Sequence, residues 1–233
     1  MTPPLVSCVV PCFNGERYLE AALRSILDQT HHPIEVIVVD DGSTDRSAEV
    51  VHRFGGRVRY HRQENRGPAG ACNTGVALAA GDFIAFLEQD DLWLPHKTER
   101  QLREFAAAPA LGYCVAQIQN FWVPELAYEA ERYRDHPVMR PVAGYVVQTL
   151  MVRRAAMDRS GPFDESLPFA FATDWFLRLR DAGVPGVLVP EVLTRRRLHE
   201  RNHSRLHRQA SRDQFLEVVK ASLDRRRERD RPL

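Results

Sequence analysis

The amino-acid sequence predicts a single α/β domain with a mostly parallel sheet flanked by helices. The chain has 233 residues, of which 44% are hydrophobic and 27% charged, with a formal net charge of +1. This composition is typical of a globular protein and unlike that of a disordered or fibrous chain. In the first half, apolar runs of strand length alternate with segments of helical spacing, which is typical of parallel strands buried between helices. A chain of this length can bury most of its apolar surface around one core.

The predicted elements of the first half alternate between strand and helix. Strands are expected at residues 5–10, 34–39, 58–60 and 83–87, and helices at 15–29, after residue 44, and at 68–80. Ser43 and Thr44 are candidate N-caps for the helix that follows the second strand. Pro68 lies near the first turn of the next helix, where a missing N–H costs nothing.

The regular alternation ends after residue 87. A loop is expected over 88–94, a helix over 95–108 and an apolar stretch over 111–118. Residues 120–145 mix prolines, charges and aromatic side chains without a sustained period, so irregular structure is expected there. Beyond them the sequence predicts strands at 148–152 and 186–189, a helix over 174–182 ended by Gly183, a helix over 205–223 and a frayed end over 225–233.

Hydropathy and cysteine spacing indicate the expected cellular location of the protein and the expected state of its cysteines. The longest apolar runs are of strand length, far short of the roughly 20 residues that span a bilayer. The N-terminus lacks the pattern of a signal peptide, so a cytoplasmic location is expected. The cysteines, Cys8, Cys12, Cys72 and Cys114, form no C-x-x-C pair. They are therefore interpreted as reduced core thiols and not as a disulfide framework or a zinc site.

The last part of the chain is strongly basic. Residues 195–233 hold 12 arginines and one lysine against six acidic residues, a net charge of +7, whereas residues 1–194 carry −6. The final arginines are expected to attract an anionic surface or acceptor, which includes a peripheral contact at the inner face of a membrane. The alternative is an ordinary solvated helix end. No nucleic-acid partner is expected, and the oligomeric state is left open.

Polar residues follow three of the predicted strands. Ligands of an open α/β sheet bind beyond the carboxyl ends of its strands, so these residues are expected to meet in one crevice. They are Pro11, Phe13 and Asn14 after the first strand, Asp40 and Asp41 after the second, and Glu88, Asp90 and Asp91 after the fourth. Carboxylates gathered in one crevice repel each other unless a cation compensates them, and such oxygen ligands suit Mg²⁺ or Mn²⁺. Asp40 and Asp41 are also ordinary turn and helix-cap residues.

Four segments match, in order and spacing, the motifs of one family. They are VVPCFNGERYL at 9–19, VDDGSTD at 39–45, NRGPAGACN at 65–73 and AGDFIAFLEQDDLW at 80–93. Together they cover residues 6 to about 105 and resemble the inverting glycosyltransferases of family 2, which have the GT-A fold. The resemblance continues in GPFDE at 161–165 and TDWFLRL at 173–179, which look like the segment bearing the family's catalytic base. Arg197, His199 and Ser204 are similar to a late element that closes over the donor diphosphate.

The resemblance implies transfer of a sugar from a nucleotide diphosphate sugar, most often a UDP-sugar, to an acceptor nucleophile with inversion at the anomeric carbon. It gives Asp174 the role of the base, and Asp91 with Asp90 the role of ligands for Mn²⁺ or Mg²⁺. Donor contacts are expected from Pro11, Phe13, Asn14, Asp40, Asp41, Arg66, Asp90, Arg197 and His199. Asp41 is expected at the nucleotide base, and Asp40 and Asp90 at the ribose. The acceptor is a saccharide, a peptide or a lipid-linked molecule.

The resemblance also divides the chain. Residues 1–204 are expected to form the GT-A domain, with nucleotide-sugar and metal binding in 1–108 and the acceptor site and catalytic base in 109–204. Residues 205–233 are expected to form a basic C-terminal helix and tail. Two positions depart from the family's pattern, because Glu88 stands where aspartate is usual and Thr173 where an acidic residue is usual.

Other interpretations of the same residues stay open. The two departures are compatible with a nucleotide-sugar-binding module that lacks turnover. A nucleotidyltransferase making a sugar nucleotide would share the α/β core, but it needs a Gly-rich basic loop after the first strand, which residues 11–17 do not provide. Asp174 is alternatively a first-turn acid favoured by the helix dipole, and His199 a solvated surface residue. Trp93 and Trp175 are alternatively plain core residues.

Overall fold

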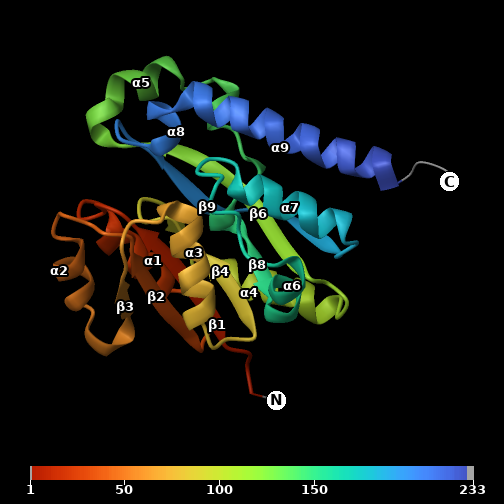
Figure 1. The fold of residues 1–233 in the computed structure, drawn as a ribbon. Helices are drawn as coiled ribbons and strands as arrows, with labels where there is room; N and C mark the ends of the chain where they lie inside the picture. The colour runs from red at the N-terminus through yellow and green to blue at the C-terminus, as the bar shows by residue number, and fades with distance from the viewer. Residues whose placement is uncertain (1, 230–233) are drawn as a thin grey trace.

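The first half of the chain forms the parallel part of the sheet. The computed structural model describes residues 2–229. Strands β1 (Val6–Cys12), β2 (Ile34–Asp40), β3 (Arg59–Arg62) and β4 (Phe83–Phe86) lie in the order β3-β2-β1-β4, all parallel (Figure 1). The crossovers run through helices α1 (Leu19–Leu27), α2 (Ser47–His52) and α3 (Gly67–Leu78), and a 3-10 turn, η1 (Gly55–Arg57), leads into β3. Parallel strands need such long crossovers.

The second half extends the same sheet with mixed strand directions. β8 (Met151–Arg153) is antiparallel to β4 and to β6 (Tyr113–Trp122), and β6 is parallel to β9 (Gly186–Leu198). β5 (Leu92–Trp93) is antiparallel to β9, and β7 (Val142–Ala143) to β6. The described residues thus form one nine-stranded sheet that is continuous across residue 108. The predicted α/β fold is confirmed, and every antiparallel pair involves a strand of the second half.

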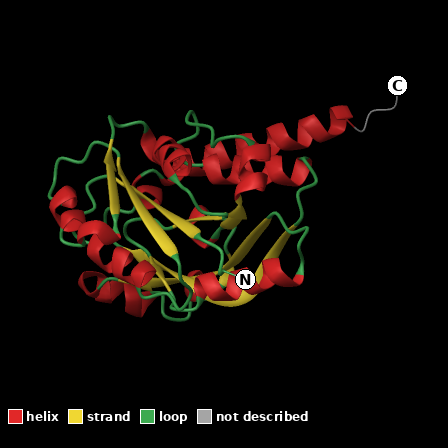
Figure 2. Cartoon of the chain, turned by 90° about the horizontal axis from the view of Figure 1, so that it is seen from below, coloured by secondary structure: helices red, strands yellow, loops and turns green. Residues whose placement is uncertain are grey.

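Helices cover both faces of this sheet, as Figure 2 shows. Side chains alternate between the two faces along a strand. Cys8 and Val10 of β1 therefore pack with the apolar residues of α1, α2 and α4 (Lys97–Ala107), whereas Val9 packs with those of α3, α6 (Arg154–Ser160) and α7 (Phe171–Asp181). The long helix α9 (Arg208–Arg229) lies on α7 as an outer layer (Figure 1).

Residues predicted for the core are found there. Trp93 is 3% exposed and Trp175 is fully buried. The cysteines, Cys8, Cys12, Cys72 and Cys114, are all free and buried. Their interpretation as core thiols is confirmed, and burial raises the pKa of Cys8 and of Cys72 far above the ordinary thiol value.

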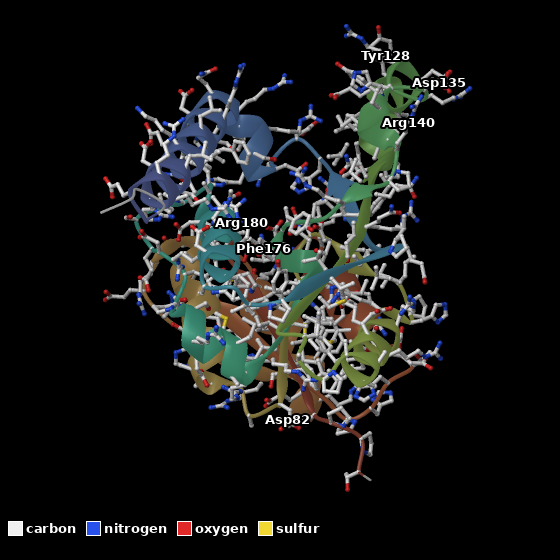
Figure 3. All side chains as sticks on the ribbon, turned by 90° about the vertical axis from the view of Figure 1, so that its right-hand side faces the viewer. Asp82, Tyr128, Asp135, Arg140, Phe176 and Arg180 are labelled. Atoms are coloured by element: carbon white, nitrogen blue, oxygen red, sulfur yellow. The ribbon has the colours of Figure 1, made fainter. Side chains whose placement is uncertain are left out.

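The second half contains more regular structure than predicted. The strand expected at 186–189 continues to Leu198, because its polar continuation pairs with β6 as far as Trp122, after two register shifts between Ala116 and Ile118. Helix α6 was not predicted, and residues 148–152 form a 3-10 turn, η4 (Val147–Thr149), followed by the short β8. Residues 120–145, expected to be irregular, hold η2 (Pro124–Leu126), α5 (Ala127–Arg132), η3 (Pro137–Met139) and β7. Figure 3 shows the segment with Tyr128, Asp135 and Arg140 standing away from the sheet, far from Asp82.

The C-terminal segment is also more helical than predicted. Helix α8 (His203–Leu206) follows β9, and α9 continues to Arg229. The expectation of a frayed end is therefore wrong for residues 225–229, where the Arg226 guanidinium anchors the helix to Asp181 of α7 at 2.8 Å. Residues 230–233 lie outside the described part of the chain. None of the helices formed by residues 2–229 combines the length and apolar character that crossing a membrane requires.

Candidate active site

Three acidic side chains meet just beyond the carboxyl end of β4. Ligand oxygens of Glu88, Asp90 and Asp91 all lie within 4.8 Å of one another. Burial, together with the charge of Asp90, raises the pKa of Glu88 to about 7. Burial and the two neighbouring carboxylates hold the pKa of Asp91 well above its usual value. A divalent cation bound by these hard oxygen donors would remove that repulsion, so the cluster fits the predicted Mg²⁺ or Mn²⁺.

Asp91 is held by partners from distant parts of the chain. One carboxylate oxygen accepts a hydrogen bond from the backbone N–H of Arg197 at 2.9 Å, and the other accepts one from the Gln148 side-chain amide at 3.0 Å. The backbone carbonyl of Gln148 in turn accepts hydrogen bonds from the Trp93 indole at 3.0 Å and the Thr194 hydroxyl at 3.2 Å. Asp91 is 1% exposed and Gln148 3% exposed. This network fixes the orientation of the Asp91 carboxylate.

Asp90 is bound by the segment that follows β9. Its carboxylate contacts the His199 ring at 2.8 Å and the Asn202 amide at 3.2 Å. The Asn202 side chain also accepts the His199 backbone N–H at 2.6 Å, which closes the turn. His199 is only 8% exposed, so its interpretation as a solvated surface residue is wrong. Asn202 was not predicted from the sequence.

Arg197 places a half-buried positive charge beside the acids. Its guanidinium donates to the backbone carbonyl of Asp90 at 2.8 Å. The same group lies between two aromatic rings, 4.7 Å from the centroid of Tyr18 and 4.8 Å from that of Phe121. Burial lowers the pKa of Arg197, but a guanidinium keeps its charge in proteins. A cation held in this way can stabilise the negative charge of a ligand that binds beside the acidic cluster.

The loops after β1, β2 and β4 are joined by hydrogen bonds. The Gln89 side chain both donates to and accepts from the backbone of Phe13, at 3.0 and 2.8 Å. Asn14 has a φ of +52° and accepts the Thr44 N–H at 2.9 Å, while the Ser43 hydroxyl accepts the Asn14 N–H at 2.9 Å. Ser43 and Thr44 thus brace the first loop, and their predicted role as caps of α2 is wrong. Phe13, next after the end of β1, remains 48% exposed.

The β2 loop buries both Asp40 and Asp41, but the two carboxylates differ in their hydrogen bonds. The Asp40 carboxylate accepts from the Ser43 N–H and the Tyr60 hydroxyl and is 1% exposed. Asp41 uses one oxygen, which accepts from the Gln63 amide at 2.7 Å and the Arg66 N–H at 2.8 Å. Its second oxygen takes no hydrogen bond from residues 2–229. Asp41 therefore retains an acceptor for a ligand, whereas Asp40 is committed to the loop.

Two of the predicted residues point to other partners. The Arg66 guanidinium pairs with Glu165 at 2.6 Å. Asp174, at the fourth position of α7, accepts from Arg178 on the same helix at 2.7 Å, and Arg178 also donates to the Pro162 carbonyl at 2.7 Å. The described hydrogen bonds thus join Asp90, Asp91, Arg197 and His199 in one network that does not include Asp174 or the Arg66 side chain.

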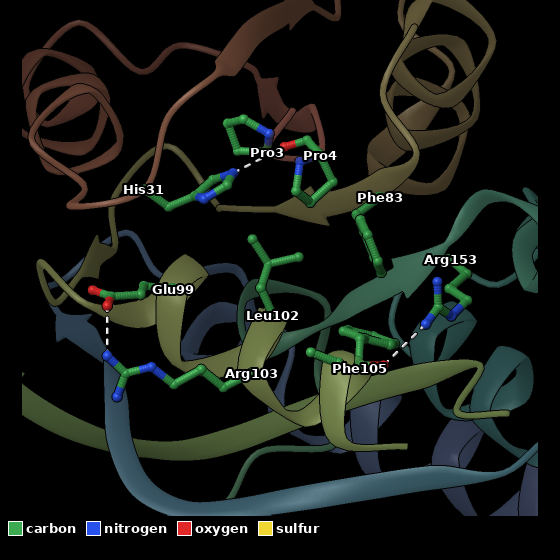
Figure 4. Close-up of a pocket in the computed structure, with 10 residues that line it drawn as sticks. Pro3, Pro4, His31, Phe83, Glu99, Leu102, Arg103, Phe105 and Arg153 are labelled. Atoms are coloured by element: carbon green, nitrogen blue, oxygen red, sulfur yellow. Dashed lines mark hydrogen bonds and ion pairs between the residues drawn. The ribbon is translucent and has the colours of Figure 1, made fainter. Parts of the chain in front are cut away.

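A separate apolar hollow lies near the start of β4 (Figure 4). Its volume is about 390 Å³, and its lining includes Pro4, Phe83, Leu102 and Phe105. Phe83 is the first residue of β4, and the acidic cluster follows the last one. The hollow therefore lies at the other end of the strand and takes no part in the candidate site.

Comparison with known proteins finds relatives of this chain. The model of glycosyl transferase family 2 matches residues 7–166. An uncharacterized glycosyltransferase of Rickettsia typhi is 31% identical over 84% of this chain and 65% of the relative. The glycosyltransferase GlyG of Streptococcus pneumoniae is 37% identical over 54% of this chain and 48% of GlyG. The chain thus spans less than about two-thirds of the length of these relatives.

Two solved structures share the architecture. S. aureus TarS 1–349, in complex with UDP-GlcNAc, superposes with a TM-score of 0.70 at 20% identity, covering 93% of this chain and 65% of TarS 1–349. The mannosyltransferase PcManGT from Pyrobaculum calidifontis, in complex with GDP-Man and Mn²⁺, gives a TM-score of 0.69 at 22% identity. That match covers 97% of this chain and 65% of PcManGT. At this level of identity the likeness establishes the fold alone.

Proposed function

The chain belongs to glycosyl transferase family 2 and has the GT-A fold, and on that premise we propose that it transfers a sugar from a nucleotide diphosphate sugar to an acceptor nucleophile with inversion. The observation that carries the proposal is the network in which Arg197, His199 and a trio of carboxylates meet beyond β4. It combines a cation site with fixed positive charge, which is what a diphosphate leaving group needs.

Asp91 and Asp90 would hold Mn²⁺ or Mg²⁺, with Glu88 close enough to assist. The metal, when bound, supplies Lewis-acid neutralisation of the charge that grows on the diphosphate. Arg197 adds a permanent positive charge next to the acidic loop, and His199 keeps Asp90 oriented. Gln148 and the Arg197 backbone fix Asp91, so the site is preorganised before the donor arrives.

Asp41 is the residue best placed for the nucleotide base, since one of its oxygens is free and the Phe13 ring is exposed on the adjoining loop. Backbone near Pro11, with Asn14 bracing the loop, completes this part of the donor site. Asp90 is assigned to the ribose, and Asp40 supports the loop that presents Asp41. Uridine is the favoured base. TarS 1–349 is seen with the uridine donor UDP-GlcNAc, whereas PcManGT is seen with the guanosine donor GDP-Man.

Asp174 is the proposed general base. An acceptor hydroxyl has a pKa far above 7, so a carboxylate must take its proton as the new bond forms. Asp174 is largely buried, and the hydrogen bond that its carboxylate accepts from Arg178 fixes its orientation on α7. Direct attack opposite the leaving group gives inversion. We assign donor and metal binding to residues 1–108 and the acceptor, a saccharide, peptide or lipid-linked molecule, to 109–204, acting in the cytoplasm.

Asp91→Asn tests the metal site. The variant keeps the shape of the side chain but removes an anionic ligand, so Mn²⁺-dependent binding of UDP, measured by calorimetry, should fall by at least about 100-fold. Asp82→Asn is the matched control, because Asp82 is exposed at the opposite end of β4, and it should bind as the wild type does. Equal binding by Asp91→Asn would remove Asp91 from the site.

Donor hydrolysis and transfer, followed by NMR of the anomeric proton, separate an enzyme from a binding module. Product of inverted configuration is expected. Binding of UDP-sugars without turnover by the wild-type chain would favour the module.

A further inference from the structure

Helix α9 is fixed in rotation by its contacts with α7. Val218 and Ser222 are 7% and 1% exposed. The Ser222 hydroxyl and the Arg226 guanidinium both reach Asp181 of α7, at 3.1 and 2.8 Å. Near its N-terminal end, Gln214 accepts two backbone N–H groups from residues 169 and 170. One side of α9 is therefore committed to the body of the protein.

A second side of α9 exposes large apolar residues. Phe215, Leu216 and Leu223 are 47%, 53% and 47% exposed. With 3.6 residues per turn, positions 216 and 223 fall on one side of the helix, away from 218 and 222, whereas position 215 lies at the border with the committed side, seven residues from Ser222. Figures 1 and 2 show the end of α9 extending past the rest of the fold. No element formed by residues 2–229 buries these side chains.

Charges on α9 are segregated by sign. The exposed cations Arg208, Arg212, Lys220 and Arg227 interleave with Leu216 and Leu223 along one ridge of i, i+4 and i, i+3 spacing. The acids Asp213, Glu217, Asp224 and Glu228 fall on the third side of the helix. Arg208, Arg212 and Lys220 form no ion pair with any residue that the structure describes. Cations and apolar side chains thus share one surface, which we call the apolar–basic face (Arg208, Arg212, Phe215, Leu216, Lys220, Leu223 and Arg227).

We propose that the apolar–basic face of α9 lies on an anionic lipid bilayer. Apolar side chains flanked by arginine and lysine match the boundary between acyl chains and anionic headgroups, where long cationic side chains reach the headgroups while their neighbours are buried. A second copy of the chain fits less well. Pairing two such faces would set cation against cation, because the acids lie on another side of the helix.

The consequence for the site depends on the proposed function. α9 packs directly on α7, the helix that carries Asp174. A bilayer held against α9 would bring a lipid-linked acceptor close to the element that bears the base. Among the acceptor classes named above, the lipid-linked class is therefore the one selected by this surface.

The test is sedimentation of the whole chain with vesicles, without nucleotide, so that its outcome is independent of catalysis. Vesicles of phosphatidylcholine are compared with vesicles in which about one-third of the lipid is phosphatidylglycerol. The wild type should bind only the anionic vesicles. Binding should weaken as salt rises from about 0.1 M to about 1 M, because the Debye length falls from about 10 Å to about 3 Å.

Variants separate the two components of the face. Phe215→Ser with Leu216→Ser should lower partitioning at least about tenfold, even in high salt. Arg212→Ala with Lys220→Ala should lower it roughly fivefold for each charge in low salt. Val138→Ser and Arg140→Ala are matched controls, since Val138 is 39% exposed and Arg140 is exposed, both far along the chain from α9. They should partition as the wild type does.

Three results would overturn the proposal. The first is equal sedimentation with neutral and anionic vesicles, and the second is equal loss of binding in the α9 variants and the controls. The third is a dimer by light scattering that Phe215→Ser with Leu216→Ser converts to a monomer, since the face would then be covered by a second copy. None of these results would affect donor binding or transfer, so the proposed function would stand.

Discussion

The two halves of the chain build the candidate site in different ways. In residues 1–108, the polar residues stand at the ends of parallel strands, and short loops join them to one another through Gln89, Asn14 and Ser43. In residues 109–229, the contributing residues lie on separate elements and reach back to the acidic loop one at a time, as Gln148, Arg197 and His199 do. The first half supplies a cluster of negatively charged side chains, and the second half supplies the residues that hold and balance it.

This difference predicts that changes in the second half alter catalysis and affinity without dismantling the crevice. Asp174→Asn should produce the largest effect, lowering turnover by about 10²–10⁴-fold while donor affinity stays near that of the wild type. The measurement is steady-state transfer alongside calorimetric binding of UDP with Mn²⁺. Near-normal turnover would place the base elsewhere, and a large loss of thermal stability would favour a helix-dipole role for Asp174.

Arg197→Ala should have the next largest effect. It removes the guanidinium but keeps the backbone N–H that Asp91 accepts, so only the charge between Tyr18 and Phe121 is lost. UDP affinity should fall about 10- to 100-fold, as expected for a half-buried charge-assisted hydrogen bond. Arg227→Ala, which removes an exposed arginine from α9, should leave UDP affinity unchanged. Equal effects of the two substitutions would mean that Arg197 acts only through net charge.

Gln148→Leu should weaken Mn²⁺ binding by about tenfold, because loss of a hydrogen-bond partner that orients a metal ligand typically lowers metal affinity by at least that factor. Its amide is the donor to one oxygen of Asp91. Gln101→Leu is the control, since Gln101 is just as buried but bonds to the backbone carbonyls of Cys114 and Thr149. Both substitutions are expected to lower stability, but only Gln148→Leu should change the Mn²⁺ titration. Parallel loss of Mn²⁺ affinity in both would reduce Gln148 to a structural residue.

The same difference between the halves explains which site residues could be predicted from the sequence and which could not. Glu88, Asp90 and Asp91 are neighbours in sequence directly after an apolar run, so periodicity and the sheet rule place them together. Gln148 is 57 residues from Asp91 and Asn202 is 112 from Asp90. No local pattern marks such partners, since each looks like an ordinary polar residue.

The extent of β9 was missed for a related reason. Its last residues include Arg195, Arg196 and Arg197, which have the composition of a loop, and only pairing with β6 makes them a strand. Strand formation there depends on a distant partner more than on local preference. Two of the guanidinium groups, those of Arg195 and Arg197, are moreover covered by the Phe121 ring, a contact that the sequence does not reveal.

The smallest effect on ligand binding is expected from a buried charge of the first half that lies outside the site. Lys97 is fully buried, with its ammonium 4.0 Å from the centroid of Trp93 and a hydrogen bond of 2.8 Å to Gln101. No carboxylate of residues 2–229 pairs with it, and burial lowers the pKa of Lys97 to about 7. The unfolded chain therefore binds this proton more tightly than the folded chain does.

Lys97→Met should consequently raise stability by roughly 1–3 kcal/mol near pH 7, or a few degrees in Tm. The cost of burying the ammonium is present in full below the folded pKa of about 7. It declines as the pH rises toward the unfolded value near 10.4, because the folded amine is then neutral. Urea unfolding of both proteins from pH 6 to about pH 9.5 should show the advantage of the variant shrinking with pH. A constant advantage would mean that Lys97 is paired in the folded chain. UDP binding should not change, since this charge belongs to the core behind the crevice and not to the network that faces the donor.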